Sequence, residues 1–218
     1  MRVNRRRFLA GSLAAAAGQL ACADPVTSPT RLTQPPVVSG IQTAQVNIGQ
    51  LAQAIRQQQC EEWCWAASIS TIFNFYGHPL TQQEIVAATY GNVVCWPSNG
   101  STNVAIDLSR TYVDNRGTRF SSRIVSAYDY YYGVNTFTNQ SIINALNSNN
   151  PLLYANMSHA MVLYSVLYAP SAFGPNILAC NVIDPWPLSP IMHGLSAAEM
   201  MEASFGGQMT FLAQVQLQ

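Results

Sequence analysis

The sequence of 218 residues contains no lysine, and charged residues make up only 9% of it. Proteins that bind nucleic acid carry clustered lysine and arginine, so this composition argues against a nucleic-acid partner. Long apolar runs are missing too: the apolar stretch near the N-terminus is shorter than the ~20 residues that span a membrane. The length is that of one ordinary domain with a substantial core.

Residues 1–23 resemble an export signal rather than part of a folded domain. Arg5 and Arg6 belong to a twin-arginine pattern, which a short apolar run and small residues follow. Cleavage after Ala23 is the favoured interpretation; acylation of Cys22, as in lipoproteins, and a basic disordered tail are the alternatives. We therefore expect an exported protein, extracellular or periplasmic, or held at the cell surface by a lipid.

Residues 24–46 are rich in Pro, Thr, Ser and Val without a helical period, which predicts an extended linker or a short pro-segment. The folded domain is predicted to span residues 47–218. Removal of the signal leaves six arginines against ten acidic residues, a formal charge of −4, and four cysteines. Because exported chains can form disulfides, these cysteines have a structural as well as a catalytic interpretation.

Helical patterns dominate the first half of this predicted domain. Apolar residues after Gln59 recur at spacings of three and four until Gly77, which predicts a helix that begins near Cys64. Thr81 and Glu84 form a capping box for a second helix that ends before residue 91. Two further helices are predicted, over residues 102–113 and 138–146.

The period changes after residue 150, where short apolar runs rich in Val, Leu, Ile and Tyr are separated by Gly, Pro, Asn and Asp. Buried strands are predicted over residues 151–157, 159–168, 177–184 and 209–217, with a short helix over residues 196–203. Helices therefore lead and strands follow, an order that predicts an α+β fold.

Cys64 occupies the predicted start of the first helix. Unpaired backbone N–H groups at a helix N-terminus favour an anion and therefore stabilise a thiolate. Cys64 is for this reason the candidate nucleophile. A catalytic thiolate also needs a base, usually a histidine that a third polar group holds in place.

Of the three histidines, His159 is the candidate base, because it comes where a loop enters an apolar strand and its ring can face a cleft. His78 should lie at the far end of the helix from Cys64 and is interpreted as a surface residue. His193 is interpreted as an exposed turn residue. Asp184 ends the next strand and can accept a hydrogen bond from His159. The alternative for its Asp-Pro pair is an ordinary turn.

Residues 58–65 resemble the active-site segment of the papain-like cysteine peptidases, most closely the small bacterial branch that includes plant-pathogen avirulence proteases. Gln58 precedes Cys64 by six residues, the spacing at which these enzymes carry a glutamine whose amide donates to the oxyanion. Trp65 supports the nucleophile in the pattern Trp-Cys-Trp-Ala-Ala. The resemblance implies a papain-like α+β fold, in which the helix that carries Cys64 packs on a C-terminal antiparallel sheet.

The resemblance extends to Trp186. His159 and Asp184 follow Cys64 in the family's order, and Trp186 stands two residues after the aspartate, where papain relatives carry a tryptophan that shields the hydrogen bond from water. Two features depart from the plant and lysosomal enzymes. The interval from Cys64 to His159 is 95 residues, shorter than their ~130 to 150, and aspartate replaces their asparagine. A compact bacterial member would show both differences.

The resemblance implies a cysteine endopeptidase, a thiol protease that hydrolyses peptide bonds through Cys64, His159 and Asp184 without a cofactor, and the predicted export signal makes it a secreted one. Its partner is a peptide or protein substrate, and we expect a monomer. Two alternatives remain open. One is an acyl-transfer enzyme of related fold, such as a transglutaminase-like, deamidating or leader-peptide-processing enzyme, and the other is a non-catalytic surface binding protein.

Cys60 and Cys95 have a structural interpretation within this resemblance. A disulfide between them would brace the wall of the active site, and a buried free thiol is the alternative. Cys180 lies in an apolar strand and is interpreted as a buried residue. A zinc site built from Cys60, Cys64, Cys95 and a histidine has an unsuitable spacing, so no metal is expected.

Overall fold

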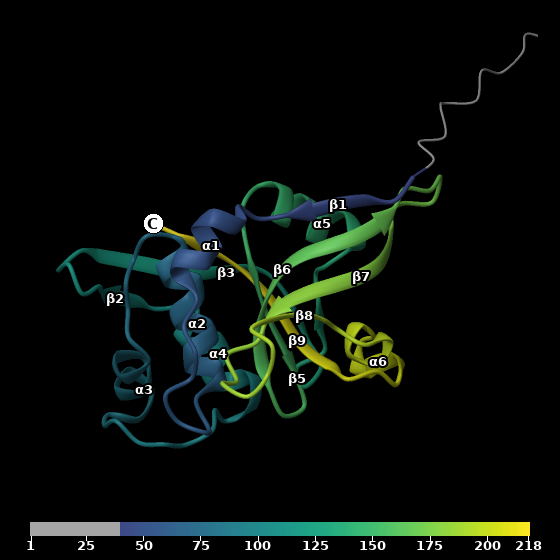
Figure 1. Cartoon of the computed structure of the whole chain (residues 1–218). Coiled ribbons are helices and arrows are strands. Elements are labelled where there is room, and N and C mark those ends of the chain that lie inside the picture. The colour runs from purple at the N-terminus through teal and green to yellow at the C-terminus, as the bar shows by residue number, and fades with distance from the viewer. Residues whose placement is uncertain (1–39) are drawn as a thin grey trace, which may run out of the picture. The chain divides into compact units, whose positions relative to one another are not determined.

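The structure, a computed structural model, describes residues 40–218, which combine six helices with a nine-stranded sheet (Figure 1). The helices are α1 (Ile48–Ala54), α2 (Cys64–Phe75), α3 (Gln82–Tyr90), α4 (Gly100–Asp107), α5 (Asn139–Asn147) and α6 (Ala197–Met200). The strands are β1 (Gln42–Gln45), β2 (Thr111–Val113), β3 (Arg119–Asp129), β4 (Val134–Asn135), β5 (Leu152–Asn156), β6 (Ala160–Ala169), β7 (Asn176–Ile183), β8 (Met192–Gly194) and β9 (Met209–Leu217). The predicted α+β class is confirmed.

The sheet brings the start of β6 and the end of β7 together, where a site can form. The strand order is β2-β3-β9-β5-β6-β7-β8, and these neighbours pair antiparallel. β5 pairs with the first half of β6, and β1 pairs with the second half. Because β6 and β7 are antiparallel, the residue before β6 and the residue after β7 come to the same end of the sheet. Those residues are His159 and Asp184.

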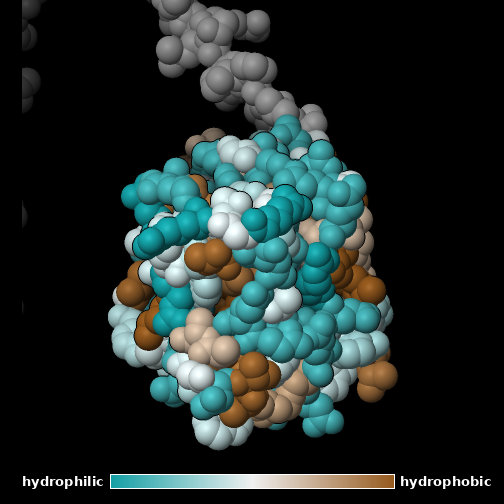
Figure 2. Space-filling view, turned by 90° about the vertical axis from the view of Figure 1, so that its left-hand side faces the viewer, coloured by the Kyte–Doolittle hydropathy of each residue, from teal (hydrophilic) through white to brown (hydrophobic). Residues whose placement is uncertain are grey.

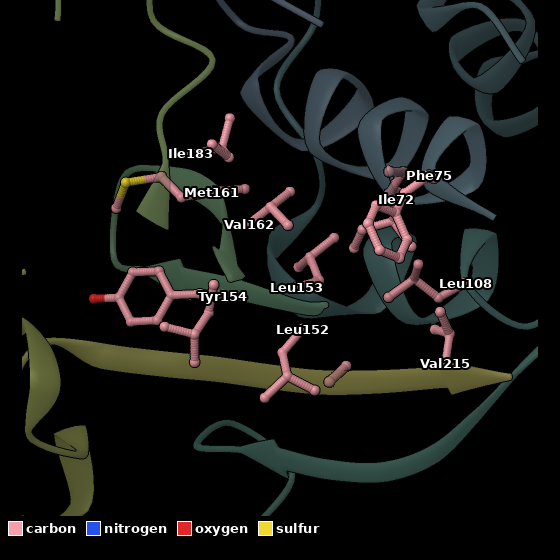
Figure 3. Packing of buried hydrophobic residues seen from close by; sticks show 14 of the residues in the cluster. Ile72, Phe75, Leu108, Leu152, Leu153, Tyr154, Met161, Val162, Ile183 and Val215 are labelled. Carbon is pink, nitrogen blue, oxygen red and sulfur yellow. The ribbon is translucent and has the colours of Figure 1, made fainter. Parts of the chain in front are cut away.

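α2 packs across the central strands and is buried along most of its length. All of its residues from Trp65 to Phe73 are buried, and Figure 3 shows side chains of this helix meeting those of β5, β6 and β9 in one core. A buried helix must satisfy its polar side chains. Ser68 does so by donating to the carbonyl oxygen of Ala160 at 3.0 Å, a bond that ties the helix to β6.

The helix ends follow the predicted capping residues. Thr81 and Glu84 form the capping box of α3, and Gly91 ends that helix with a left-handed φ of 77°. Thr138 caps α5. Gly77 follows α2 with a φ of 87°, a conformation that costs glycine little because it lacks a Cβ. Local sequence signals therefore set the bounds of these three helices.

The predicted third helix is wrong in its second half, because α4 ends at Asp107 and residues 111–113 form β2. Val104, Leu108 and Tyr112 recur every four residues, which is a helical spacing, and all three are buried. Tyr112 reaches the core from β2 instead, with its ring centroid 5.4 Å from that of Phe73. The buried strand residue Tyr112 thus continues the apolar spacing of the helix before it, and this spacing predicted a longer helix.

The predicted order of helices before strands is also incomplete, because β2, β3 and β4 lie between α4 and α5. β3 is not predicted from the sequence. Its Ser122 faces the core, where the side chain donates to the carbonyl oxygen of Leu108 at 2.7 Å. A polar residue at a buried position interrupts the alternation by which a strand is recognised.

The folded part begins at Gln42 and not at the predicted Asn47. Residues 42–45, at the end of the predicted linker, form β1 and pair with the second half of β6. The predicted signal, Cys22 and the linker up to residue 39 lie outside the described residues. Within residues 40–218, no helix is long and apolar enough to cross a membrane.

The surface beside α3 and β2 is largely hydrophilic. Figure 2 shows hydrophobic side chains scattered among hydrophilic ones on this face. Scattered apolar side chains are normal on a protein surface and do not by themselves indicate a binding site. A function can instead be argued from the cavity that Cys64 and His159 line.

Candidate active site

Cys64 is the first residue of α2 and lines a cavity of about 340 Å³. Trp63, the N-cap residue, makes no side-chain hydrogen bond to the first turn. The N–H groups of that turn are consequently available to an anion at the thiol or at a bound carbonyl oxygen. His159, Trp65 and Trp186 line the same cavity.

His159 is fixed by the turn between β5 and β6. Asn156 Oδ1 accepts hydrogen bonds from the N–H groups of Ser158, at 3.0 Å, and His159, at 2.8 Å. The N–H of Asn156 in turn donates to the carbonyl oxygen of His159 at 3.0 Å. These bonds hold the turn in one shape, so the histidine ring enters the cavity from a rigid backbone. Sequence reasoning did not single out Asn156, although asparagine is typical of such turns.

Asp184 lies beside His159 as the strand order requires. His159 Nε2 is 2.6 Å from Asp184 Oδ1, and the Trp186 N–H donates to the same oxygen at 2.8 Å. The carboxylate is deeply buried. Because Nε2 is engaged by the aspartate, Nδ1 is the ring nitrogen left to serve Cys64.

The pKa values of this pair move in opposite directions. Burial lowers the pKa of His159, but its hydrogen bond to Asp184, its contact with Cys64 and the charges of both outweigh burial and raise the value from 6.5 to about 9. Burial raises the pKa of Asp184, yet the bonds from His159 and the Trp186 N–H lower it from 3.8 to about 2. His159 is therefore protonated and Asp184 ionised at neutral pH.

These shifts set the pH window of the interaction. The raised pKa of His159 means that its contribution to stability is full below about pH 6.5 and is lost as the pH rises through about 9. The lowered pKa of Asp184 means that its contribution is present above pH 3.8 and is lost as the pH falls through about 2. The pair is thus intact across the neutral range.

Two buried bonds connect the elements that carry the three side chains. Ser68, one turn after Cys64, donates to the carbonyl oxygen of Ala160, the residue after His159. The backbone N–H of Gln58 donates at 2.9 Å to the carbonyl oxygen of Pro185, the residue after the aspartate. The positions of helix and sheet are therefore coupled at the site itself.

The Gln58 side chain holds the loop before the nucleophile. It is 6% exposed, and its Nε2 donates to the carbonyl oxygens of Cys60, at 3.1 Å, and Glu61, at 2.8 Å. A side-chain amide has two N–H bonds, and both are engaged. The structure thus gives Gln58 a supporting contact near Cys64, and its donation to an oxyanion stays a prediction.

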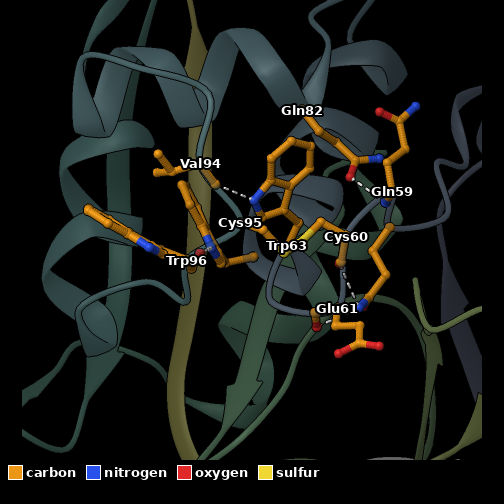
Figure 4. The surroundings of a disulfide bond; sticks show 10 residues. Gln59, Cys60, Glu61, Trp63, Gln82, Val94, Cys95 and Trp96 are labelled. Carbon is orange, nitrogen blue, oxygen red and sulfur yellow. Dashed lines mark hydrogen bonds between the residues drawn. A yellow bond between two sulfur atoms is a disulfide. The ribbon is translucent and has the colours of Figure 1, made fainter.

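A disulfide joins Cys60 to Cys95, whose Cα atoms are 5.9 Å apart (Figure 4). Beside it, Trp63 Nε1 donates to the carbonyl oxygen of Val94 at 2.8 Å. The loop that leads to Cys64 is therefore fastened to the segment after α3. Among the described residues the free cysteines are Cys64 and Cys180, and burial raises the pKa of Cys180 to about 12.

Removal of this disulfide is expected to lower the free energy of unfolding by about 2–4 kcal/mol, because the bridge closes a long loop of the unfolded chain. The sequence separation is 35 residues. The measurement is denaturant unfolding of Cys60→Ser, Cys95→Ser and the double variant without reductant. All three should be destabilised equally, since each lacks the same bridge. Unchanged unfolding of the variants would contradict a structural role for the bond.

Each of the other two histidines contacts an aspartate. His78 Nδ1 lies 3.1 Å from Asp114 Oδ2, and its ring stacks on Phe120. His193 lies in β8, with Nε2 at 3.3 Å from Asp184 Oδ2. The interpretation of His193 as an exposed turn residue was wrong, because β8 places it beside Asp184 and local sequence patterns did not predict this strand. His78 keeps 24% of its side chain exposed, and its contacts with Asp114 and Phe120 were not predicted.

The described residues contain no group of three or more His, Cys, Asp or Glu side chains that could hold a metal ion. The cysteines of the zinc alternative have other contacts: Cys60 is bonded to Cys95, and Cys64 faces His159. The donor chemistry near the cavity is that of a nucleophile, an imidazole and a carboxylate.

Residues 47–172 match the family described as Peptidase_C39 like family. The chain belongs to this family. The matched residues include Cys64 and His159, whereas Asp184 lies beyond them. Family membership confirms the prediction of a papain-like cysteine peptidase at the level of the superfamily, and the small bacterial branch stays a prediction.

Comparisons with individual proteins add little to the family assignment. No curated protein matches the sequence. A similar solved structure is the crystal structure of UfSP from C.elegans, with 16% identity and a TM-score of 0.46. The similarity covers 86% of this chain, which spans only 36% of that chain's length.

Proposed function

We propose that this member of the Peptidase_C39 like family is an exported cysteine endopeptidase that cleaves peptide bonds through Cys64, His159 and Asp184. The proposal is carried by the 2.6 Å contact between Asp184 Oδ1 and Nε2 of His159, a residue that lines the same cavity as Cys64. It supplies a nucleophile, a proton donor and an orienting carboxylate in one place.

The geometry supports an acyl-transfer mechanism. The Cys64 thiolate attacks the amide carbonyl, so that an S–C bond forms and the carbonyl oxygen becomes an oxyanion near the first turn of α2. The C–N bond then breaks, and protonated His159 gives the Nδ1 proton to the leaving amine. Asp184 keeps the ring oriented and stabilises its charge. Water, activated by neutral His159, attacks the thioester and releases the acid and the Cys64 thiolate.

The disulfide supports the proposal of export. Disulfides form and persist outside the reducing cytosol, and Cys60 and Cys95 are joined in the folded chain. The twin-arginine pattern at Arg5 and Arg6 and the small residues before residue 24 suggest the route. We propose an extracellular or periplasmic location, with a lipid at Cys22 as the alternative form of the N-terminus.

Incubation of the purified protein with a diverse peptide library is expected to produce new peptide N-termini without a matching release of ammonia. A mild reductant keeps Cys64 reduced, and mass spectrometry identifies the products while an ammonia assay runs in parallel. The Cys64→Ala variant is the matched control. Ammonia release without new termini would favour a deamidating or transglutaminase-like enzyme. Inertness towards the library would favour the alternative of a binding protein.

A further inference from the structure

Asp184 is contacted on both of its carboxylate oxygens. His159 Nε2 and the Trp186 N–H contact Oδ1, at 2.6 and 2.8 Å, and His193 Nε2 lies 3.3 Å from Oδ2. The residue is 5% exposed, so protein groups rather than bulk water determine how the carboxylate turns. The contact from His193 has no part in the mechanism described above.

The His193 ring is held by the sheet. β8 pairs antiparallel with β7, and His193 stands opposite Val182, two residues before Asp184. Backbone hydrogen bonds lie on both sides of His193. The N–H of Asp184 donates to the carbonyl oxygen of Ile191 at 2.9 Å, and the N–H of Leu195 donates to the carbonyl oxygen of Cys180 at 2.8 Å. A ring anchored in this way can fix what it contacts.

A carboxylate held by one oxygen alone would not be fixed. The terminal torsion of aspartate is broad, because it joins an sp³ carbon to an sp² carbon. A second bond on Oδ2 removes that freedom and sets the plane of the group. The shorter distance on Oδ1 shows that His159 is the main partner of Asp184, so His193 does not compete with it for the same oxygen.

Each ring nitrogen of His193 faces an acceptor. Nε2 faces Asp184 Oδ2, and Nδ1 lies 3.1 Å from the carbonyl oxygen of Gly194. A neutral imidazole has a single N–H. A bond to a carboxylate is stronger than a bond to a neutral carbonyl, so the proton belongs on Nε2, facing Asp184.

We infer that His193 is a positioning residue, which donates from Nε2 to Asp184 Oδ2 and holds the carboxylate so that Oδ1 faces His159. The effect on turnover rests on the proposed peptidase function. The effect on the reactivity of Cys64 does not, because an aligned, protonated His159 favours the Cys64 thiolate whatever the substrate is.

Two substitutions separate the hydrogen bond from the shape of the ring. His193→Phe keeps a ring without a donor, and His193→Gln keeps an N–H donor without a ring. His193→Phe is expected to lower kcat about 10-fold with KM unchanged within about twofold, the size expected for a lost bond to a charged group. His193→Gln should restore kcat to within about threefold of the native value.

Alkylation of Cys64 by iodoacetamide at neutral pH gives a second measurement that needs no substrate. The rate should fall in His193→Phe and recover in His193→Gln, because the thiolate depends on the alignment of His159. His78→Phe makes the same change at the other histidine–aspartate pair and should alter neither kcat nor the alkylation rate. If His193→Phe melts well below the native protein, His193→Ala replaces it with the same expectation.

If the ring of His193 served only to fill space, the order of the two variants would be reversed: His193→Phe would have near-native kcat and alkylation rate, and His193→Gln would be impaired in both. That order, or a native rate of both kcat and alkylation in His193→Phe, would overturn the inference. Failure of the native protein to cleave any peptide would instead reject the proposed function. The alkylation rates of the two variants would then decide the role of His193 by themselves.

Discussion

Replacement of Cys64 by alanine is expected to lower peptide hydrolysis by at least about 10⁴-fold, because the variant has no sulfur with which to form the acyl intermediate. The fold should be retained, since alanine is a good helix former and Cys64 is only half-buried. The measurements are kcat/KM on a cleaved peptide and the thermal midpoint from circular dichroism.

Cys180→Ala is the control for Cys64→Ala, because it removes the other free thiol of the described chain. Cys180 lies in β7 beside a separate apolar cavity lined by Tyr154 and Leu163. Its loss should reduce stability by leaving a small void but should leave kcat close to native. Hydrolysis that survives Cys64→Ala and is lost in Cys180→Ala would show that the nucleophile is misassigned.

Replacement of Asp184 by alanine is expected to lower kcat by about 10²- to 10⁴-fold and to move the alkaline limb of the pH–activity profile to lower pH. Burial, which lowers the pKa of His159, remains in the variant, whereas the bond and charge of Asp184, which together with those of Cys64 raise it to about 9, are removed. The pKa of His159 therefore falls. The protonated form of His159 is then lost earlier as the pH rises.

Two further variants test this explanation. Asp184→Asn keeps an oxygen that can accept from His159, so its kcat should lie between those of the native protein and Asp184→Ala. Asp114→Ala removes the carboxylate of the other histidine–aspartate pair, where Asp114 contacts His78. It should change stability and leave the pH–activity profile in place. A profile that does not move in Asp184→Ala would contradict the assigned role of Asp184.

Local signals in the sequence predicted the parts of the site that depend on neighbouring residues. The apolar spacing after Gln59 and the stop at Gly77 placed Cys64 at the start of α2, where the structure has it. The apolar runs on either side of residue 170 predicted β6 and β7. Antiparallel pairing of those strands then brings His159 to Asp184, so this contact followed from two correctly predicted elements.

Contacts that depend on unpredicted strands could not be found in this way. β8 has three residues, follows a proline-rich turn and ends in a glycine, so nothing in its pattern indicated that His193 faces Asp184. Gln58 shows a different limit. Its spacing from Cys64 fits an oxyanion donor, but spacing does not say that Cys60 and Glu61 offer carbonyl oxygens to the same amide.

The most direct measurement maps the cysteine that reacts with a thiol-reactive peptide epoxide. The reduced protein is labelled at neutral pH, digested and examined by mass spectrometry, with His159→Ala labelled in parallel. The expected result is an adduct on Cys64 that is slow to form in His159→Ala, and an unlabelled Cys180, whose pKa burial raises to about 12. An unmodified Cys64, or equal labelling with and without His159, would contradict the proposal of a thiolate that this histidine activates.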